Sequence, residues 1–415
     1  MAAHCRPLFM TEVKVVIGAG FGDEGKGLMT DYLASKMNSG IVVRFNGGAQ
    51  AAHTVVTPDG RRHVFGHFGS GTFVGFPTYL SRFFVVNPPL FVKEAASLNK
   101  LGVAPVVYVD RACLVTTPYD MMLNQIAEII RGDSRHGSCG IGFNETITRS
   151  LVDDPSPGLF SLTVGDIGDE DLLAYKLWLI KEEYVPLRLA QLGITSVPDL
   201  YADLLASDSV IDHFIEDVGT LLGAVTPADS RILSSFSSVL FEGAQGLLLD
   251  QSHKFFPHVT RSNTGMQNVA ELLVEAGLNE CPVEIVYVTR TYMTRHGAGP
   301  FPTELPDKPY TGIEDLTNIP NPYQGALRYG LLDLDFLAET VRNDLRFADG
   351  LDYEAKLAIT CLDQVDHKAR YIVDSEQVDS QVCDFVEKVF DTAGVRAGYV
   401  SFGPTRITVF AVSFR

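Results

Sequence analysis

Short apolar segments alternate with longer amphipathic ones along this chain, beginning with residues 13–17. That first segment predicts a buried strand, and residues 28–37 predict a helix directly after it, because their apolar side chains recur at helical spacing. Residues 41–45 predict a second strand. Further apolar segments predict four more strands, at residues 106–109, 239–241, 283–289 and 357–360. The alternation indicates the α/β class with a mostly parallel central sheet.

Two long segments between these strands predict helices, at residues 169–192 and 199–222. In the first helix we expect Trp178, Leu179 and Leu187 to lie in the core rather than against a ligand. The sequence contains neither an internal repeat nor a linker long enough to separate two domains. We therefore predict a flexible N-terminal extension at residues 1–12 and one large domain, with helical and loop insertions, at residues 13–415.

Composition limits the classes of function. The 415 residues are 46% hydrophobic and 20% charged, which is typical of a globular protein with a large core. The formal net charge of −18 argues against a nucleic-acid partner, and no apolar segment approaches the length of a membrane span. The cysteines are widely separated and lack zinc-site spacing, so we expect reduced thiols in a cytoplasmic protein. They are Cys5, Cys113, Cys139, Cys281, Cys361 and Cys383.

A glycine-rich loop at residues 20–27, with the sequence GFGDEGKG, follows the first predicted strand. It fits the phosphate-binding pattern Gly-x-x-x-x-Gly-Lys-Ser/Thr except at Gly27, where the pattern has a magnesium-binding hydroxyl. Asp23 and Glu24 would repel a polyphosphate unless a divalent cation or an acid–base step required one of them. The loop therefore predicts a nucleotide site with catalytic chemistry built into it. The alternative is a tight connection between a strand and a helix.

A second loop of small residues with a polar cluster, residues 46–54, follows the second predicted strand. In open α/β sheets, ligands bind outside the carboxyl ends of the strands. We therefore expect the two loops to face one site.

Short motifs in a fixed order resemble the adenylosuccinate synthetase family over nearly the whole chain. Each motif is weak alone, but their common order is not expected by chance. The motifs are residues 22–27, 46–48 with 53–54, 162–166, 241–246 with 248–250, 259–260 with 262–264, 294–295 with 297–304, and 401 with 403–404.

The resemblance implies a two-step ligation. A nucleoside triphosphate phosphorylates the 6-oxygen of a purine monophosphate, and the amino group of L-aspartate then displaces that phosphate. Such chemistry needs a base for the purine N1 proton and an acid or cation for the charge growing on O6. By resemblance, Asp23 is the base and a Mg²⁺ ligand, His53 assists the transfer to O6, and Lys26 and Gln245 complete the catalytic set.

The resemblance also assigns residues to each substrate. The carbonyl of Ala52 falls where the family uses a backbone oxygen on Mg²⁺. Arg149 falls near the family's arginine that reaches the phosphate in the neighbouring subunit, which implies a homodimer; the alternative is a solvated surface arginine. The donor nucleotide is assigned Gly22, Asp23, Glu24, Gly25, Lys26, Gly27, Ala52, His53, Thr54, Asp363, Ser401, Gly403 and Pro404. The purine monophosphate is assigned Asp23, Asn46, Gln50, Gly137, Ser138, Cys139, Arg149, Gln245, Thr260 and His296. L-aspartate is assigned Tyr323, Gln324, Gly325, Ala326, Leu327 and Arg328.

Several positions depart from the common pattern of the family. Ala326 stands where the family has an arginine that also approaches the ribose 2′-hydroxyl. A site without that arginine no longer favours ribose over deoxyribose. Cys361 replaces the lysine of the guanine-reading Thr-Lys-x-Asp motif, which makes ATP or dATP a candidate donor beside GTP. Gln50 replaces the second residue of a His-Asn pair, and residues 135–142 replace a threonine-rich turn.

These departures resemble a viral branch of the family that joins aspartate to dGMP for diaminopurine DNA. Asp23 disagrees with that branch, whose members tend to lose the loop aspartate. We therefore expect dGMP as the acceptor, with IMP as the alternative. A nucleotide-dependent switch protein is the alternative from another class, and Gly27 and Cys361 argue against it.

Overall fold

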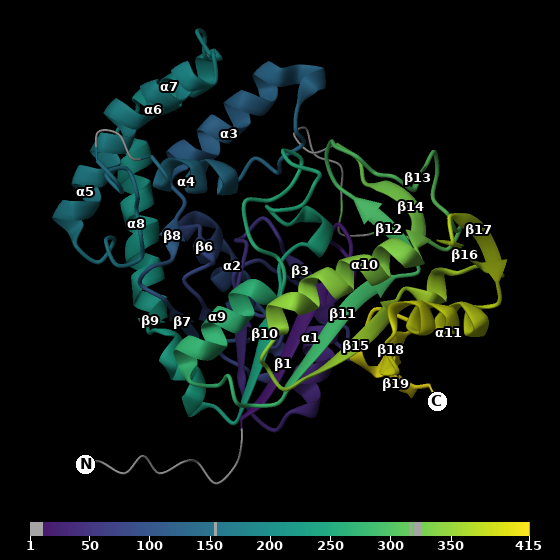
Figure 1. Cartoon of the computed structure of the whole chain (residues 1–415). Coiled ribbons are helices and arrows are strands. Elements are labelled where there is room, and N and C mark those ends of the chain that lie inside the picture. Colours follow the sequence, from purple (N-terminus) through teal and green to yellow (C-terminus); the bar gives the residue numbers. More distant parts are fainter. Residues whose placement is uncertain (1–10, 153–155, 316–317, 319–324, 415) are drawn as a thin grey trace, which may run out of the picture.

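A ten-stranded sheet forms the centre of the computed structural model, which describes residues 11–152, 156–315, 318 and 325–414 (Figure 1). Eight neighbouring strand pairs run parallel, and the pair β18–β19 at one edge is antiparallel. From edge to edge the strands are β19 (Val409–Ser413), β18 (Ala397–Ser401), β15 (Tyr353–Thr360), β11 (Val283–Arg290), β1 (Glu12–Gly18), β10 (Ser238–Glu242), β2 (Ile41–Arg44), β5 (Thr78–Leu80), β7 (Val107–Val109) and β9 (Val225–Pro227). The predicted α/β class with a mostly parallel central sheet is confirmed.

All six strands predicted from the sequence belong to this sheet. The sheet begins earlier than expected, because Glu12 pairs with Ser238 and the Thr11 hydroxyl donates to the carbonyl of Phe236 at 3.3 Å. Thr11 and Glu12 are therefore part of the fold, which corrects the end of the expected extension. Residues 1–10 of that extension lie outside the described residues.

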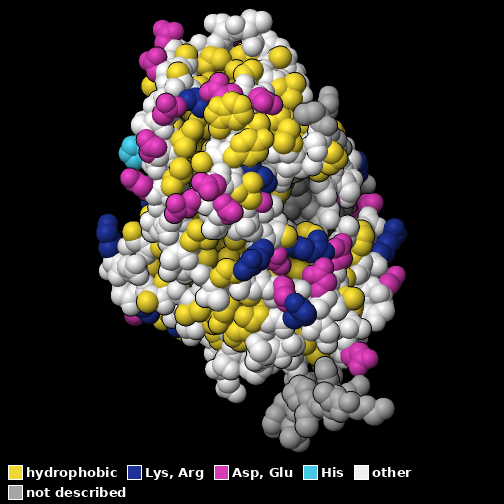
Figure 2. Space-filling view, turned by 90° about the vertical axis from the view of Figure 1, so that its left-hand side faces the viewer, with side chains coloured by type: hydrophobic (Ala, Val, Ile, Leu, Met, Phe, Trp, Pro, Cys, Tyr) yellow, Lys and Arg dark blue, Asp and Glu magenta, His cyan; other side chains and the backbone are white. Residues whose placement is uncertain are grey.

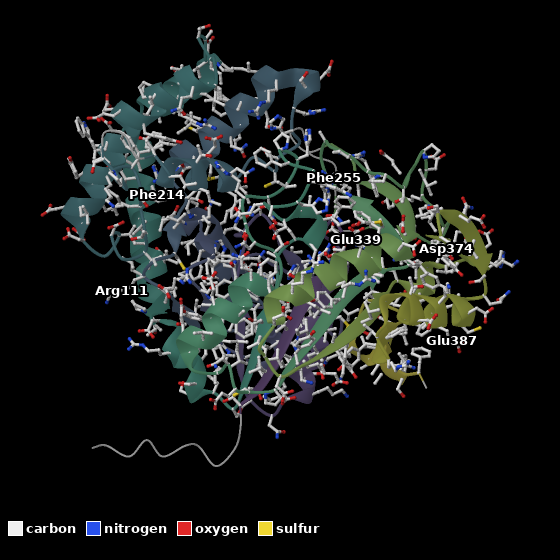
Figure 3. All side chains as sticks on the ribbon, viewed as in Figure 1. Arg111, Phe214, Phe255, Glu339, Asp374 and Glu387 are labelled. Carbon is white, nitrogen blue, oxygen red and sulfur yellow. The ribbon has the colours of Figure 1, made fainter. Side chains whose placement is uncertain are left out.

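Helices cover both faces of the sheet, and side chains fill the layers between them (Figure 3). On one face, Leu28, Met29 and Leu33 of α1 (Lys26–Lys36) pack against strand residues such as Val16 and Val42. The other face is covered by α9 (Met266–Ala276), α10 (Leu334–Leu345) and α11 (Val382–Ala393). Successive side chains of a strand point to opposite faces of the sheet. Because helices cover both faces, neither face of the central strands is polar.

The remaining helices gather at the β9 end of the sheet, where Phe214 of α8 is buried among side chains of α2 and α5 (Figures 1 and 3). They are α2 (Pro88–Lys100), α3 (Pro118–Arg131), α4 (Phe143–Ser150), α5 (Glu170–Leu179), α6 (Val185–Gln191), α7 (Asp199–Ala206) and α8 (Ser209–Ala224). A π-helical turn, Ile180–Tyr184, joins α5 to α6, so the helix predicted at 169–192 is present with one irregular turn.

Hydrophobic side chains are exposed on this helical end, among acidic ones (Figure 2). Leu179 is buried as predicted, but Trp178 is 51% exposed and Leu187 is 38% exposed. The prediction that Trp178 and Leu187 lie in the core is therefore wrong. Both are large apolar side chains on the outer face of their helices, which helical spacing alone does not distinguish from the inner face.

Smaller sheets carry the loops that surround the carboxyl ends of the central strands. A hairpin joins β3 (His53–Val56) to β4 (Arg62–Phe65), and β6 (Val85–Val86) pairs with β8 (Leu114–Val115). The second larger sheet contains β12 (Tyr292–Arg295), β13 (Glu304–Leu305), β14 (Arg328–Asp333), β16 (Ala369–Val373) and β17 (Glu376–Ser380).

Membrane spans and disulfides were the two remaining questions that the sequence raised about the whole chain. Within the described ranges, no helix is long and apolar enough to cross a membrane. Cys113, Cys139, Cys281, Cys361 and Cys383 are free thiols, while Cys5 lies outside the described residues.

Candidate active site

The carboxylate of Glu24 occupies the centre of the glycine-rich loop. Its Oε1 accepts the N–H groups of Gly20 and Gly22 at 3.0 and 2.7 Å, and its Oε2 lies 2.6 Å from Nζ of Lys26. Glu24 and Lys26 are 4% and 2% exposed. A β-carbon at Gly18 would lie 2.3 Å from this carboxylate, so the loop closes around it only with glycine there.

This arrangement changes the expected role of the loop. In a phosphate-binding loop, the backbone N–H groups and the lysine hold phosphates. Here an internal carboxylate already holds two such N–H groups and the ammonium of Lys26. Glu24 is thus turned away from the nucleotide it was expected to contact, and any phosphate must meet the outer side of the loop.

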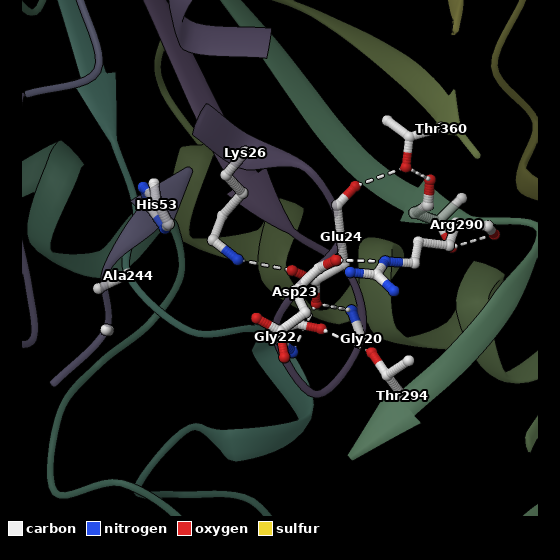
Figure 4. A network of polar contacts seen from close by, with 12 residues as sticks. Gly20, Gly22, Asp23, Glu24, Lys26, His53, Ala244, Arg290, Thr294 and Thr360 are labelled. Carbon is white, nitrogen blue, oxygen red and sulfur yellow. Dashed lines mark hydrogen bonds and ion pairs between the residues drawn. The ribbon is translucent and has the colours of Figure 1, made fainter. Parts of the chain in front are cut away.

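Side chains from the ends of neighbouring strands fix three consecutive carbonyl groups of the loop (Figure 4). These bonds join the Thr294 hydroxyl to the Gly22 oxygen, Arg290 Nε to the Asp23 oxygen, and the Thr360 hydroxyl to the Glu24 oxygen. The loop is therefore anchored to β11, β12 and β15, although no sequence motif links them.

Asp23 presents its side chain to the main cleft of the molecule. Its backbone has φ of 63°, a left-handed conformation that is strained for a non-glycine residue. Its Oδ2 lies 3.0 Å from Nε2 of His296. Burial by itself would raise the pKa of the Asp23 carboxyl, but the hydrogen bond and charge of His296, with the charges of Arg290 and Lys26, hold that pKa below its usual range. Asp23 is thus an ionised carboxylate.

His53, the first residue of β3, is held by a buried carboxylate from β10. Nδ1 of His53 lies 2.6 Å from Oε1 of Glu242, whose other oxygen accepts the N–H of Ser70 at 2.9 Å. Burial, with the charges of Arg44 and Lys26, holds the pKa of His53 below its usual value, although Glu242 acts to raise it. Nε2 of His53 is buried, has no hydrogen-bond partner among the described residues, and belongs to a residue that lines the cleft. This Nδ1 contact orients the ring so that Nε2 faces a ligand.

A cleft of about 400 Å³ lies between the helical end and the loops that follow β1, β2, β10 and β12. Asp23 is the one acidic side chain among its described lining residues, whereas Lys26 and Arg295 line it as cations. Four histidines also line it: His53, His136, His258 and His296. In a chain with a net charge of −18, this lining suits an anionic ligand.

Gln245 and Gln50 line the cleft with polar groups that lack partners in the part of the chain that the structure describes. Nε2 of Gln245 donates to the Thr260 hydroxyl at 2.9 Å, so the amide orientation leaves Oε1 as a free acceptor. Nε2 of Gln50 is a buried donor without a partner. Unsatisfied buried groups gathered at a cleft mark a binding site, since each is costly unless a ligand or water completes it.

Asn46 is not among the described residues that line the cleft. Its amide donates to the carbonyl of Ala244 at 3.0 Å and accepts the N–H of Ala244 at 2.7 Å, and the residue is fully buried. Asn46 thus ties the loop after β2 to the loop after β10. Its side chain is thus engaged within the protein, and its assignment to the purine monophosphate stays a prediction.

Gly137, Ser138 and Cys139, in the turn at residues 137–142, line the helical wall of the cleft. Glu128 and Asn124 on α3 hold the turn: Glu128 accepts the Gly137 N–H at 2.8 Å, and Asn124 donates to the Ser138 hydroxyl at 2.7 Å. The turn also meets the loop after β12, where the Ala298 N–H donates to the carbonyl of His136 at 3.2 Å. Two walls of the cleft are therefore in contact.

The residues expected to read the donor base lie together at a different part of the sheet edge. Asp363 follows β15. Ser401 ends the adjacent strand β18, and Gly403 and Pro404 follow that strand. The Ser401 hydroxyl donates to the carbonyl of Gly403 at 2.9 Å. None of these four, nor Thr54, is among the described residues that line the cleft. The topology thus places the residues that were expected to read the donor base outside the cleft.

The expected aspartate loop is described only in part. Tyr323 and Gln324 lie outside the described residues, and Gly325, Ala326 and Leu327 precede β14. Arg328 is bound to Glu304 through Nε and Nη2 at 2.7 and 2.5 Å. Its Nη1 donates to the carbonyls of Gly297 and Gly299, both at 3.0 Å. Most donors of Arg328 are therefore engaged within the protein.

The position of Arg149 contradicts both sequence interpretations. It is 1% exposed, and its guanidinium bonds to both oxygens of Asp120 at 2.8 Å and to the carbonyl of Val115 at 2.9 Å. A buried, fully paired guanidinium is neither a solvated surface group nor free to reach a neighbouring subunit's ligand. The homodimer inferred from Arg149 stays a prediction.

Two residues at the site were missed in the sequence. Glu242 ends β10 inside the motif at residues 241–246, three residues before Gln245, and that position was the available signal. Arg295 is buried under Phe21, with its guanidinium carbon 4.4 Å from the ring centroid, and its Nε and Nη1 have no partner in the described part of the chain. Only the folded chain brings Arg295 to the cleft and Glu242 to His53, which lines it.

An anchored glycine loop, an ionised carboxylate and an oriented histidine around a nucleotide-sized cleft define a nucleotide-using enzyme. A sequence model of the adenylosuccinate synthetase family matches residues 15–368. The chain therefore belongs to the adenylosuccinate synthetase family and is a ligase that forms a C–N bond.

Comparisons with individual proteins agree. The chain is 31% identical over 381 residues to the adenylosuccinate synthetase of Mesoplasma florum, covering 88% of this chain and 81% of that protein. It is 28% identical to the enzyme of Desulfotalea psychrophila, covering 96% and 97%. Two solved structures share the fold: Plasmodium falciparum adenylosuccinate synthetase, with TM-score 0.70, 18% identity and coverage of 97% and 100%, and cyanophage S-2L succinoaminodeoxyadenylate synthetase (PurZ), with TM-score 0.61, 17% identity and coverage of 97% and 95%.

Proposed function

We propose that this chain joins L-aspartate to C6 of IMP, using a nucleoside triphosphate to phosphorylate O6 first. The observation that carries this proposal is the position of the Asp23 carboxylate, which lines one cleft together with Lys26 and His53. The names of two relatives support IMP as the acceptor, because the proteins of Mesoplasma florum and Desulfotalea psychrophila are both adenylosuccinate synthetases. The sequence favoured dGMP as the acceptor, with IMP as the alternative.

In this reaction Asp23 takes the proton from purine N1 while O6 gains the phosphoryl group. His53 faces O6 through Nε2. Burial lowers the pKa of His53, so the ring takes up a proton only as negative charge develops on O6, and Glu242 then supplies the compensating negative charge at Nδ1. Gln245 supplies an acceptor or donor to the purine edge from a fixed amide. These contacts orient the purine so that the amino group of aspartate can attack C6 once the phosphate is a leaving group.

Magnesium fits this site. The described residues contain no cluster of three side chains that could cage a metal by themselves. Mg²⁺ usually takes one or two carboxylates together with water and substrate phosphates. Asp23 and the carbonyl of Ala52, which both line the cleft, would hold it. When bound, the ion would neutralise charge on the donor phosphates.

Specific substitutions favour dGMP as a second candidate acceptor, with ATP or dATP as donor. Ala326 offers no guanidinium to a ribose 2′-hydroxyl, and Cys361, with φ of 61°, has no cationic stem for a guanine donor. Asp23 disagrees with this candidate, because the viral enzymes that resemble the chain tend to lose it. In this reading the product is a 2-aminoadenylosuccinate deoxynucleotide for diaminopurine synthesis.

A turnover assay decides between the two acceptors. Purified protein is incubated with aspartate, Mg²⁺ and either GTP or ATP, with IMP, GMP or dGMP in separate reactions, and the products are separated by chromatography. Aspartate-dependent product from IMP supports the proposal, and product from dGMP but not IMP replaces it with the second candidate. Triphosphate hydrolysis that needs neither aspartate nor a purine monophosphate contradicts both.

A further inference from the structure

The Asp23 carboxylate depends on a single side-chain partner. Among the described residues, His296 is the one group in hydrogen-bond contact with it, at 3.0 Å between Nε2 and Oδ2. Lys26 lies in the same loop but is bound to Glu24 at 2.6 Å. Arg290 contacts Asp23 only through its backbone carbonyl. The cations nearest to the carboxylate are therefore committed elsewhere.

The backbone alone does not fix this side chain in the cleft. Asp23 has φ of 63° and is followed, across Glu24, by Gly25 with φ of 95°. Arg290 and Thr294 hold the carbonyls of residues 23 and 22, but neither contacts the carboxylate. The side chains of Asp23 and His296 are 27% and 25% exposed, and both line the cleft. The carboxylate is thus partly exposed and accessible to a ligand in the cleft.

We propose that His296 is a positioning residue for Asp23. Resting on the proposed function, His296 binds Oδ2 and thereby leaves Oδ1 directed at the N1–H of a 6-oxopurine. Both IMP and dGMP carry that N1–H, so the proposal holds for either acceptor. The charge-assisted bond between His296 and Asp23 is strong enough to select one side-chain orientation.

The donor on His296 can be replaced by a side chain of similar reach. In His296→Gln, Nε2 of the amide can donate to Oδ2 of Asp23, whereas His296→Ala leaves no donor. His213→Ala is the matched control, because His213 is exposed on α8 and bonds only to its own helix at Ser209. Misplacement of a reacting group by about 1 Å costs about 100-fold in rate.

We expect His296→Ala to lower kcat about 100-fold with little change in KM for the triphosphate, and His296→Gln to recover at least about tenfold of that loss. His213→Ala should match the unaltered protein. Equal losses in His296→Ala and His296→Gln overturn the proposal, as does a loss that appears only in KM for the purine monophosphate, because His296 would then bind the nucleotide itself.

A second measurement does not depend on the reaction. In a crystal structure of ligand-free His296→Ala, the Asp23 carboxylate should leave the position that it has beside Nε2, and in His296→Gln it should keep that position. An Asp23 carboxylate that stays in place in His296→Ala overturns the proposal. If the unaltered protein makes no aspartate-dependent product, the proposed function fails while this structural comparison still judges the role of His296.

Discussion

At the scale of single residues, the site concentrates strained and unsatisfied groups. Asp23, Gln245 and Cys361 have left-handed backbones, with φ between 61° and 63°, and each lies in a loop at a strand's carboxyl end. Such conformations persist where surrounding contacts fix them and where function requires them. The sequence motifs identified all three positions, but the strain arises from long-range contacts that hold their loops.

The contact between His53 and Glu242 leads to a prediction for Glu242→Gln. This change keeps the size of the side chain but removes the charge that supports a protonated His53. We expect kcat to fall by about 100-fold or more with a small change in KM for each substrate, as measured by steady-state kinetics.

Glu145→Gln is the matched control for this experiment. Glu145 is also buried and paired, with Arg188 at 2.7 Å, but it lies outside the described lining of the cleft. Its kcat should stay unchanged. A Glu242→Gln protein with normal kcat would remove His53 from the transfer step.

At the scale of elements, loops that are far apart in sequence line one cleft and contact each other. The turn at residues 137–142 is held by α3, and it meets the loop after β12 closely enough that a β-carbon at Gly137 would lie 2.5 Å from Cα of Gly297. The sequence predicted that the turn contacts the purine monophosphate. It did not predict the contact between the turn and residues 297–298, because no local pattern records which loops meet.

This close approach predicts a specific effect of Gly137→Ala. The added methyl group would push the turn away from Gly297 and widen the cleft. We expect the Kd of the purine monophosphate, measured by calorimetry, to rise about tenfold or more, which corresponds to about 1.4 kcal/mol.

Gly158→Ala provides the control, because Gly158 has a similar φ of 73° but no atom within 4 Å of an added β-carbon. Both variants should lose a similar amount of stability from backbone strain, about 1 kcal/mol. Only Gly137→Ala should weaken nucleotide binding. Equal Kd values for the two variants would mean that the contact between the loops does not shape the site.

At the scale of the whole molecule, charge is distributed unevenly. The chain carries a formal net charge of −18, yet its cleft is lined by one described acidic side chain against Lys26, Arg295 and four histidines. An anionic substrate is therefore attracted locally and repelled by the protein as a whole. Salt screens these interactions according to distance and exposure.

This distribution predicts how salt affects binding. The cleft contacts are short and partly buried, so raising the ionic strength from about 0.1 to 1 M, which shortens the Debye length from about 10 to 3 Å, should weaken IMP binding by less than about tenfold. Inosine, which lacks the phosphate, should bind with the same Kd at both salt concentrations in calorimetry. A loss of IMP affinity greater than about 100-fold would indicate that exposed cations outside the cleft hold the phosphate.

The sequence by itself determined the class of fold, the order of the strands along the chain and the loops that carry the chemistry. It did so because apolar periodicity and glycine-rich turns are local properties of consecutive residues. The tertiary structure decided which side chains meet: Glu24 with Lys26, Glu242 with His53, His296 with Asp23 and Asp120 with Arg149. Two of these pairs join residues more than 180 positions apart, and their contact follows from strand order and burial, which local patterns do not encode.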